Sequence, residues 1–170
     1  MKDVIYQSAV MIRREIENEK SVHDLTQKDP AATTFMSTID AAIAHIANIF
    51  HPNHQINPVE LQECTTKIQE SECIMALLSS YLVNPQNILA VTRSQLPAQT
   101  VTNVSTWLNN ILSPWIKNLG GSIWTFLTQN LSVKEWKISG GISGAGLVNA
   151  SLEITFDPLQ GNFGGGAGHP

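Results

Sequence analysis

Four glycines stand close together near the C-terminus, at Gly140, Gly141, Gly144 and Gly146. With Ser139 they have the spacing of a turn that holds the pyrophosphate of a dinucleotide cofactor. Such a turn lies between a strand and a helix, and an acidic residue about 20 positions further on binds the ribose. Here the glycines are followed by a segment that alternates like a strand, and no acidic residue stands at that distance. We therefore predict no cofactor and interpret the glycines as the turn of a β-hairpin, where they permit positive φ angles.

Three histidines, His45, His51 and His54, together with Cys64, raise the possibility of a metal site. No Cys-x-x-Cys or His-Glu-x-x-His spacing accompanies them, and we interpret the histidines as solvated loop residues. The chain also contains no Gly-x-Ser-x-Gly element that would present a nucleophile. We predict no catalytic and no metal-binding residue. An enzyme whose site is assembled from scattered residues stays the third alternative for function.

The two cysteines, Cys64 and Cys73, are nine residues apart on what reads as one helix. At that spacing they lie on opposite sides of the helix and ~13 Å apart, beyond the reach of a disulfide. We predict free thiols, as is typical of a protein in a reducing compartment.

Charge and composition exclude one class of partner. Only 14% of the 170 residues are charged, and ten basic against fourteen acidic residues give a net charge of -4. That is the wrong sign for binding the phosphates of nucleic acid, so we exclude nucleic acid as a partner. The N-terminal segment lacks the apolar run of a secretory signal, and no stretch is long enough to span a bilayer. We expect a cytoplasmic protein.

Apolar residues at steps of three and four predict three helices in the first half of the chain. The first runs over about 3–20. The second covers about 30–51 and begins after Asp29, which suits an N-cap. The third covers about 57–83, and its Glu60 can reach back to the amide of the capping residue.

The composition changes after a short helical piece predicted at about 86–93. From Ser94 to Val133 the only charged side chain is Lys117, yet the stretch holds three of the four tryptophans. Pro114 and the pair Gly120-Gly121 divide it. Separate helices are therefore predicted near 98–112, 114–119 and 122–131.

The fold class that follows is mainly α (α+β), a four- to five-helix bundle with a C-terminal antiparallel β-hairpin at about 133–157. Apolar and polar residues alternate on both sides of the glycine cluster, which is typical of strands with one buried face. We predict one domain over 1–158. Residues 159–170 are rich in glycine and are predicted to form a flexible tail.

The uncharged tryptophan-bearing stretch supplies the functional hypothesis. Its apolar residues follow helical rows, so the simplest interpretation is a core helix. Tryptophan is also enriched at binding hot spots, and interface centres are poor in charge, which favours a recognition surface. The candidate interaction residues are Trp107, Ile111, Trp115, Ile116, Trp124, Phe126 and Leu127.

We therefore predict a non-enzymatic protein–protein interaction module: an adaptor, a chaperone-like subunit or an effector. It would bind another protein or a second copy of itself, through this helical surface or through the edge of the hairpin. The alternative is a membrane-active amphipathic helical domain that lies on a membrane surface. A single lysine in the stretch gives little attraction to anionic lipid, which favours the protein partner.

Overall fold

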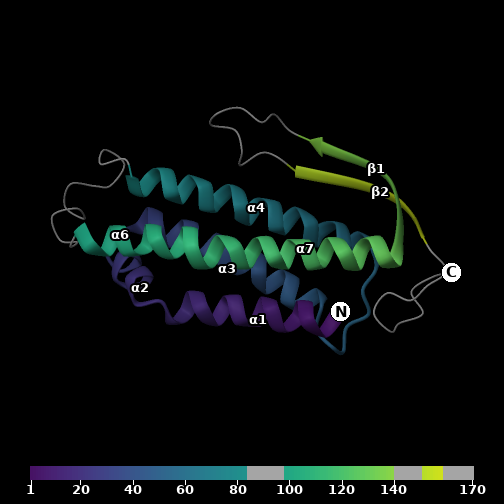
Figure 1. The fold of residues 1–170 in the computed structure, drawn as a ribbon, viewed down its shortest axis with the longest axis horizontal. Coiled ribbons are helices and arrows are strands. Elements are labelled where there is room, and N and C mark those ends of the chain that lie inside the picture. The colour runs from purple at the N-terminus through teal and green to yellow at the C-terminus, as the bar shows by residue number, and fades with distance from the viewer. Residues whose placement is uncertain (84–97, 140–150, 159–170) are drawn as a thin grey trace.

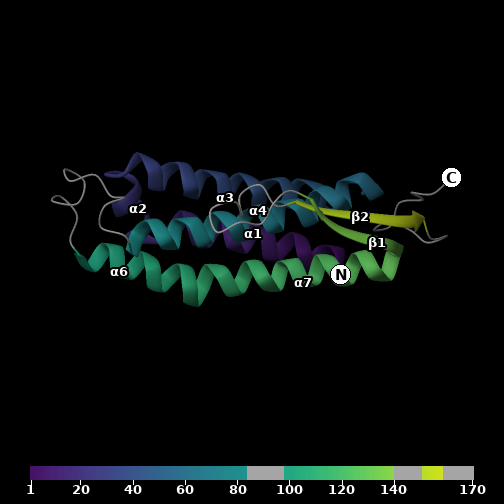
Figure 2. The same ribbon diagram turned by 90° about the horizontal axis from the view of Figure 1, so that it is seen from above.

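The structure, a computed structural model, describes residues 1–83, 98–139 and 151–158, and the side chains of 1–83 and 98–130. Four long helical segments lie side by side along the longest axis (Figures 1 and 2). They are α1 (Lys2–Asn18), α3 (Pro30–Ile49), α4 (Pro58–Val83) and a rod made of α6 (Ala98–Trp107), the π-helix η1 (Leu108–Leu112) and α7 (Ser113–Asn130). Each packs on the next, and α7 closes the circle by packing on α1. The predicted mainly helical bundle is confirmed, with an up-and-down order of helices.

The first predicted helix, at about 3–20, is confirmed as α1, and a short helix that was not predicted follows it. α1 buries Ile5, Ala9, Ile12 and Ile16, the stripe that its sequence pattern indicates. At Glu19 the backbone becomes extended, and the short helix α2 (Lys20–Thr26) begins. The carboxylate of Glu19 accepts hydrogen bonds from the backbone amide and the hydroxyl of Ser21, so this residue ends one helix and caps the next.

Asp29 links α3 to α4 at one end of the bundle. One carboxylate oxygen caps α3, as predicted, by accepting from the amides of Ala31 at 3.0 Å and Ala32 at 3.3 Å. The other oxygen accepts from the hydroxyl of Tyr81, in the last turn of α4, at 2.7 Å. Asp29 is buried, and these three hydrogen bonds compensate for the loss of water around its carboxylate.

The predicted capping box at the start of α4 is confirmed. The side chain of Asn57 accepts from the amide of Glu60 at 2.9 Å, and the carboxylate of Glu60 accepts from the amide of Asn57 at 3.1 Å. The face of α4 that the sequence pattern marks as apolar is the face that is buried. Its buried residues are Leu61, Cys64, Ile68, Ser71, Met75, Leu78 and Leu82.

The predicted breaks in the tryptophan-bearing stretch are wrong, because α6, η1 and α7 form one continuous rod. Pro114 lacks an amide, and inside an α-helix its ring would clash with the carbonyl four residues earlier. Directly before it the chain widens into η1, where the amide of Ser113 donates to the carbonyl of Leu108, five residues back. We attribute the tolerance of Pro114 to this wider turn.

Gly120 and Gly121 likewise sit inside α7 without ending it. A Cβ atom at Gly120 would lie 2.9 Å from Cγ2 of Ile68 on α4, closer than real Cβ atoms approach. A Cβ atom at Gly121 would meet nothing within 4 Å. Gly120 therefore permits a close approach of α7 to α4.

The strands β1 (Leu131–Ser139) and β2 (Ser151–Pro158) pair antiparallel. Their register runs from Leu131 opposite Pro158 to Ser139 opposite Ser151, with an irregularity between Val133 and Glu135. The glycine turn predicted to join them, the tail 159–170 and the helical piece at 86–93 all lie outside the described residues. The hairpin as a unit therefore stays a prediction.

Replacing Gly120 with alanine should destabilise the protein. The side chain of Ile68 is branched at Cβ and has little rotational freedom in a helix, so the new methyl group forces α7 and α4 apart. We expect Gly120→Ala to lower the free energy of unfolding in urea by about 1–3 kcal/mol.

Gly121→Ala is the matched control, because its methyl group has open space and alanine favours helix. It should raise stability by up to ~1 kcal/mol. Equal effects of the two changes would contradict the close approach, as would an undiminished loss for Gly120→Ala in an Ile68→Ala background.

The hydrogen bond between Tyr81 and Asp29 should be visible in a pH titration. Burial, the hydrogen bond and the charge of Asp29 raise the pKa of Tyr81 from 10.0 to about 12. Because the folded-state pKa lies above the unfolded one, the stability from this group is complete below pH 10.0 and is lost as the pH rises to about 12. The absorbance difference at the tyrosinate band between wild type and Tyr81→Phe reports this ionisation. Asp29→Asn, which retains a capping side chain, should lower the pH midpoint of the Tyr81 ionisation. An unchanged midpoint would contradict the hydrogen bond between Tyr81 and Asp29.

Candidate functional site

Four of the seven candidate interaction residues belong to the core. Trp107, Ile116, Phe126 and Leu127 are buried among α1, α3, α4 and the rod, so the prediction that they form a binding surface is corrected. Phe126 packs edge-on against Phe50 of α3, with ring centroids 5.4 Å apart. The indole nitrogen of Trp107 donates to the carboxylate of Glu15 on α1 at 2.9 Å, which satisfies the polar atom of a buried ring.

The other three, Ile111, Trp115 and Trp124, are only partly buried and lie at the edge of the core. Trp115 lines a small groove of about 150 Å³ between α1 and α7, whereas Trp124 lines one of about 330 Å³ between α4 and α7. The groove at Trp124 also contains Glu72 and Lys117. The structure thus divides the predicted surface between two sides of the rod.

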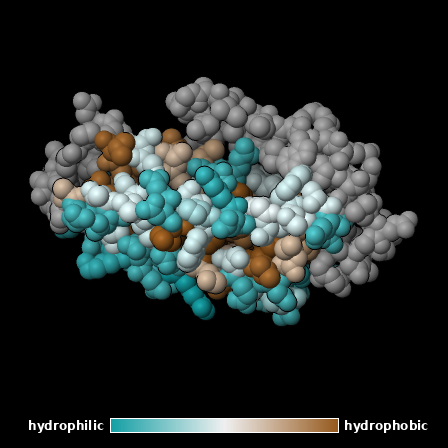
Figure 3. Space-filling view, in the orientation of Figure 1, coloured by the Kyte–Doolittle hydropathy of each residue, from teal (hydrophilic) through white to brown (hydrophobic). Residues whose placement is uncertain are grey.

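The groove at Trp115 is uncharged. Its lining consists of Ser8, Met11, Ile12, Trp115, Asn118, Leu119 and Ser122. Among the side chains that the structure describes, none that lines this groove carries a charge. In Figure 3 hydrophobic atoms lie along the seam between α1 and α7, with hydrophilic residues on either side.

The α1 side of this seam was missed by the sequence analysis. Val4 is 58% exposed and Met11 is 54% exposed, although both are large apolar side chains. Val4 and Met11 lie two helical turns apart, with Ser8 between them. The three residues form a stripe beside the buried one. We call the surface formed by Val4, Ser8 and Met11 of α1 and by Trp115 and Asn118 of α7 the α1–α7 face. The heptad-like spacing of residues 4, 8 and 11 was the available signal, but it was masked by the stronger buried stripe.

A wider groove, of about 640 Å³, lies between α1, α2 and α3. Across it Arg13 on α1 holds Asp40 on α3 with two hydrogen bonds, each of 3.1 Å. The guanidinium pKa of Arg13 is raised, chiefly by these bonds. The groove is therefore bridged by a bidentate ion pair, and its lining mixes both charges with apolar residues.

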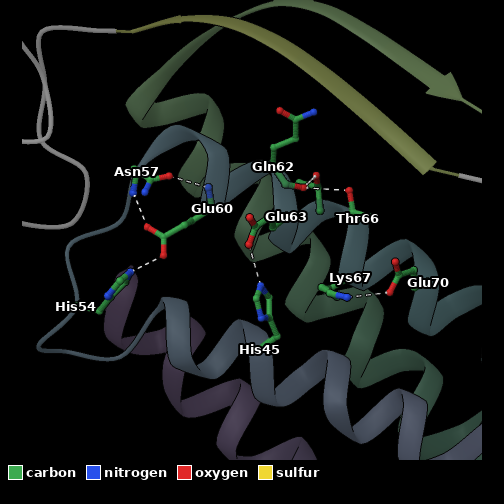
Figure 4. A network of polar contacts seen from close by, with 10 residues as sticks. His45, His54, Asn57, Glu60, Gln62, Glu63, Thr66, Lys67 and Glu70 are labelled. Carbon is green, nitrogen blue, oxygen red and sulfur yellow. Dashed lines mark hydrogen bonds and ion pairs between the residues drawn. The ribbon is translucent and has the colours of Figure 1, made fainter.

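The histidines do not all lie in loops. His45 belongs to α3, and its Nε2 lies 2.9 Å from Oε2 of Glu63 on α4 (Figure 4). His54 follows α3, and its Nε2 lies 2.6 Å from Oε2 of Glu60. The interpretation as solvated loop residues is wrong for His45, which belongs to a helix, and is confirmed for His54, which lies in the loop after α3; both are part-exposed and each is paired with a carboxylate. His51 contacts the ring of Tyr6 edge-on, at 5.4 Å between centroids.

A histidine held by a carboxylate is also part of many catalytic sites, where it acts on a neighbouring nucleophile. Here the hydroxyl of Thr66, which belongs to the same network, donates to the carbonyl of Gln62 (Figure 4). In residues 1–83 and 98–130, no three His, Cys, Asp or Glu side chains gather closely enough to hold a metal ion. The geometry supports a structural role, because the two pairs fasten α3 and the segment after it to the first turns of α4.

Both cysteines are free, as predicted. Cys64 is buried, and burial followed by the charges of Glu63 and Glu60 raises the pKa of its thiol. Cys73 is partly exposed, and its pKa is also raised, by burial and then by Glu72 and Glu70. Neither environment favours the thiolate that a nucleophilic cysteine needs.

Comparison with known proteins gives no relative: no protein-family model, no curated protein and no solved structure matches this chain. Among its described helices, none combines the length and apolarity needed to cross a membrane.

Thiol labelling tests the description of the two cysteines. With Ellman's reagent near neutral pH, the native protein should show one slowly reacting thiol, Cys73, which reacts faster as the pH rises because its thiolate fraction grows. Cys64 should react only in denaturant. Native Cys73→Ser should be inert, and rapid reaction of that variant would contradict the burial of Cys64.

Proposed function

We propose that this protein is a non-enzymatic protein–protein interaction module and that it binds through the α1–α7 face. The observation that carries the proposal is the uncharged groove at Trp115, which Met11 lines, together with Val4 on the same stripe of α1; both apolar side chains are more than half exposed. Exposed apolar groups that adjoin one another on a folded domain are typical of binding surfaces.

The composition of the face agrees with how protein interfaces are built. Their centres are poor in charge and rich in aromatic residues and methionine. Trp115 offers a large ring whose body is anchored in the core, and Met11 offers a flexible side chain that adapts to a partner. Ser8 and Asn118 supply hydrogen-bonding groups within the same groove.

The edge of the predicted hairpin is a second possible route to a partner, by addition of a strand. Lys134, Glu135 and Lys137 lie along β1, and charges on an edge strand discourage indiscriminate pairing. We therefore place the α1–α7 face first.

The membrane alternative is less well supported by this face. Helices that lie on membranes carry lysine and arginine on their polar side, so that they attract anionic lipid. The exposed side of α1 carries Arg14 but also Asp3 and Glu17, so both signs are present.

Site-specific photocrosslinking tests the proposal. We place p-benzoylphenylalanine at Met11, and separately at Val59, which is 65% exposed on α4. Irradiation in an extract of cells that express the chain should give a discrete adduct from position 11 and none from position 59. The adduct should disappear with Val4→Glu, because the new charge cannot be buried at an apolar contact.

Circular dichroism should show that the labelled and charged variants retain the fold. Adducts of equal yield from both positions, or none from either, would overturn the assignment of the face. Flotation with neutral and anionic vesicles separates the alternative: protein that rises with the vesicles, but not after Met11→Glu, would replace the proposal with membrane binding.

A further inference from the structure

Helix α1 has a second apolar stripe that no described residue covers. Met1, Val4, Ser8 and Met11 follow one another at steps of three, four and three, the spacing of a coiled-coil seam. Met1, Val4 and Met11 are exposed, and the small residue Ser8 lies between the last two. A small residue at the middle of such a stripe allows another helix to approach closely. The stripe ends at Glu15, whose carboxylate is held by Trp107.

Two charged residues, Asp3 and Arg14, lie beside this stripe on its side away from α7, at opposite ends, and Arg14 also lines the groove between α1, α2 and α3. Asp3 and Arg14 are eleven positions apart, ~16 Å along the helix axis, and helical spacing puts them on the same side. Neither has an ion-pair or hydrogen-bond partner in the part of the chain whose side chains the structure describes.

A two-fold axis beside Ser8 would make this edge complementary to itself. In an antiparallel pair of α1 helices, Val4 of one copy lies near Met11 of the other, and Asp3 of one copy lies near Arg14 of the other. Symmetry produces each of these contacts twice. A parallel pair would not place this edge against its own copy.

The opposite edge of the stripe, toward α7, brings no like charges together when two copies associate. The same symmetry places Trp115 and Asn118 near the α7 helix of the second copy, and no charged side chain lines the groove there among the described residues. For a chain with a net charge of -4, a surface that brings no like charges together is where self-association costs least.

We propose that α1 packs antiparallel against α1 of a second copy of this chain, with the α1–α7 faces in contact and with Asp3 paired to Arg14 across the two-fold axis. The inference rests on the proposed function and names its partner. It assigns a role to two charged residues that the bundle itself does not use.

Sedimentation equilibrium with a charge-swap series tests the proposal. The wild-type protein should dimerise reversibly, and Met11→Glu should remove the dimer. Arg14→Asp and Asp3→Arg each place like charges together twice, so each should weaken dimerisation by about tenfold. The double variant Asp3→Arg, Arg14→Asp restores opposite charges and should restore wild-type affinity. Val59→Glu is the control and should leave the dimer unchanged.

Circular dichroism of each variant excludes unfolding as the cause of a lost dimer. Rescue by the double variant supports the antiparallel arrangement, since a structural defect in either single variant would not be repaired by adding the other. A dimer that still forms with Met11→Glu would overturn the proposal. Single variants whose dimerisation the double variant does not restore would also overturn it. A wild-type monomer at all concentrations would also overturn it, and in that case a crosslink from Met11 to a different protein would leave the proposed function standing.

Discussion

The helical rod from Ala98 to Asn130 has to pack on α1 along one side and on α4 along another, and the rest of the bundle depends on its meeting both. The rod is fixed at two points, where the indole of Trp107 binds Glu15 and where Gly120 lets α7 approach Ile68. Hydrophobic burial supplies the driving force, but these two contacts decide which side of the rod faces which neighbour. The grooves on either side follow from that orientation.

The scarcity of charge between residues 94 and 133 therefore has a different meaning in the core and at the surface. Most of the rod's apolar side chains are core, and a charge there would be buried without a partner. At Trp115 a strip of the rod is apolar and uncharged without being fully buried. Combined with Val4 and Met11 from the other end of the chain, that strip makes a surface that neither helix presents alone. Sequence composition points to the rod, but the surface needs α1 beside it.

Much of the fold could be predicted because local rules and tertiary packing agree in α1, α3 and α4. Their apolar stripes are the buried stripes, and Asp29 and Asn57 cap as their types suggest. The failures come from residues whose role is set at long range. Gly120 looks like a helix breaker until Ile68 is placed against it, and Pro114 looks like one until the wider turn before it is known. His45 and Glu63 are eighteen positions apart, so their pairing depends on how α3 and α4 align.

The π-helix η1 has a further consequence for how the rod is phased. Its five-residue hydrogen bond accommodates one residue more than a regular α-helical turn, and each residue of an α-helix rotates the following chain by ~100°. Removing one residue between Leu108 and Leu112 would leave a regular helix but would turn everything after it relative to Trp107. The anchor at Glu15 and the fit of Gly120 could then no longer be satisfied together. The extra residue in η1 thus sets the rotation of α7 relative to α6, so that one rod can pack on both α1 and α4.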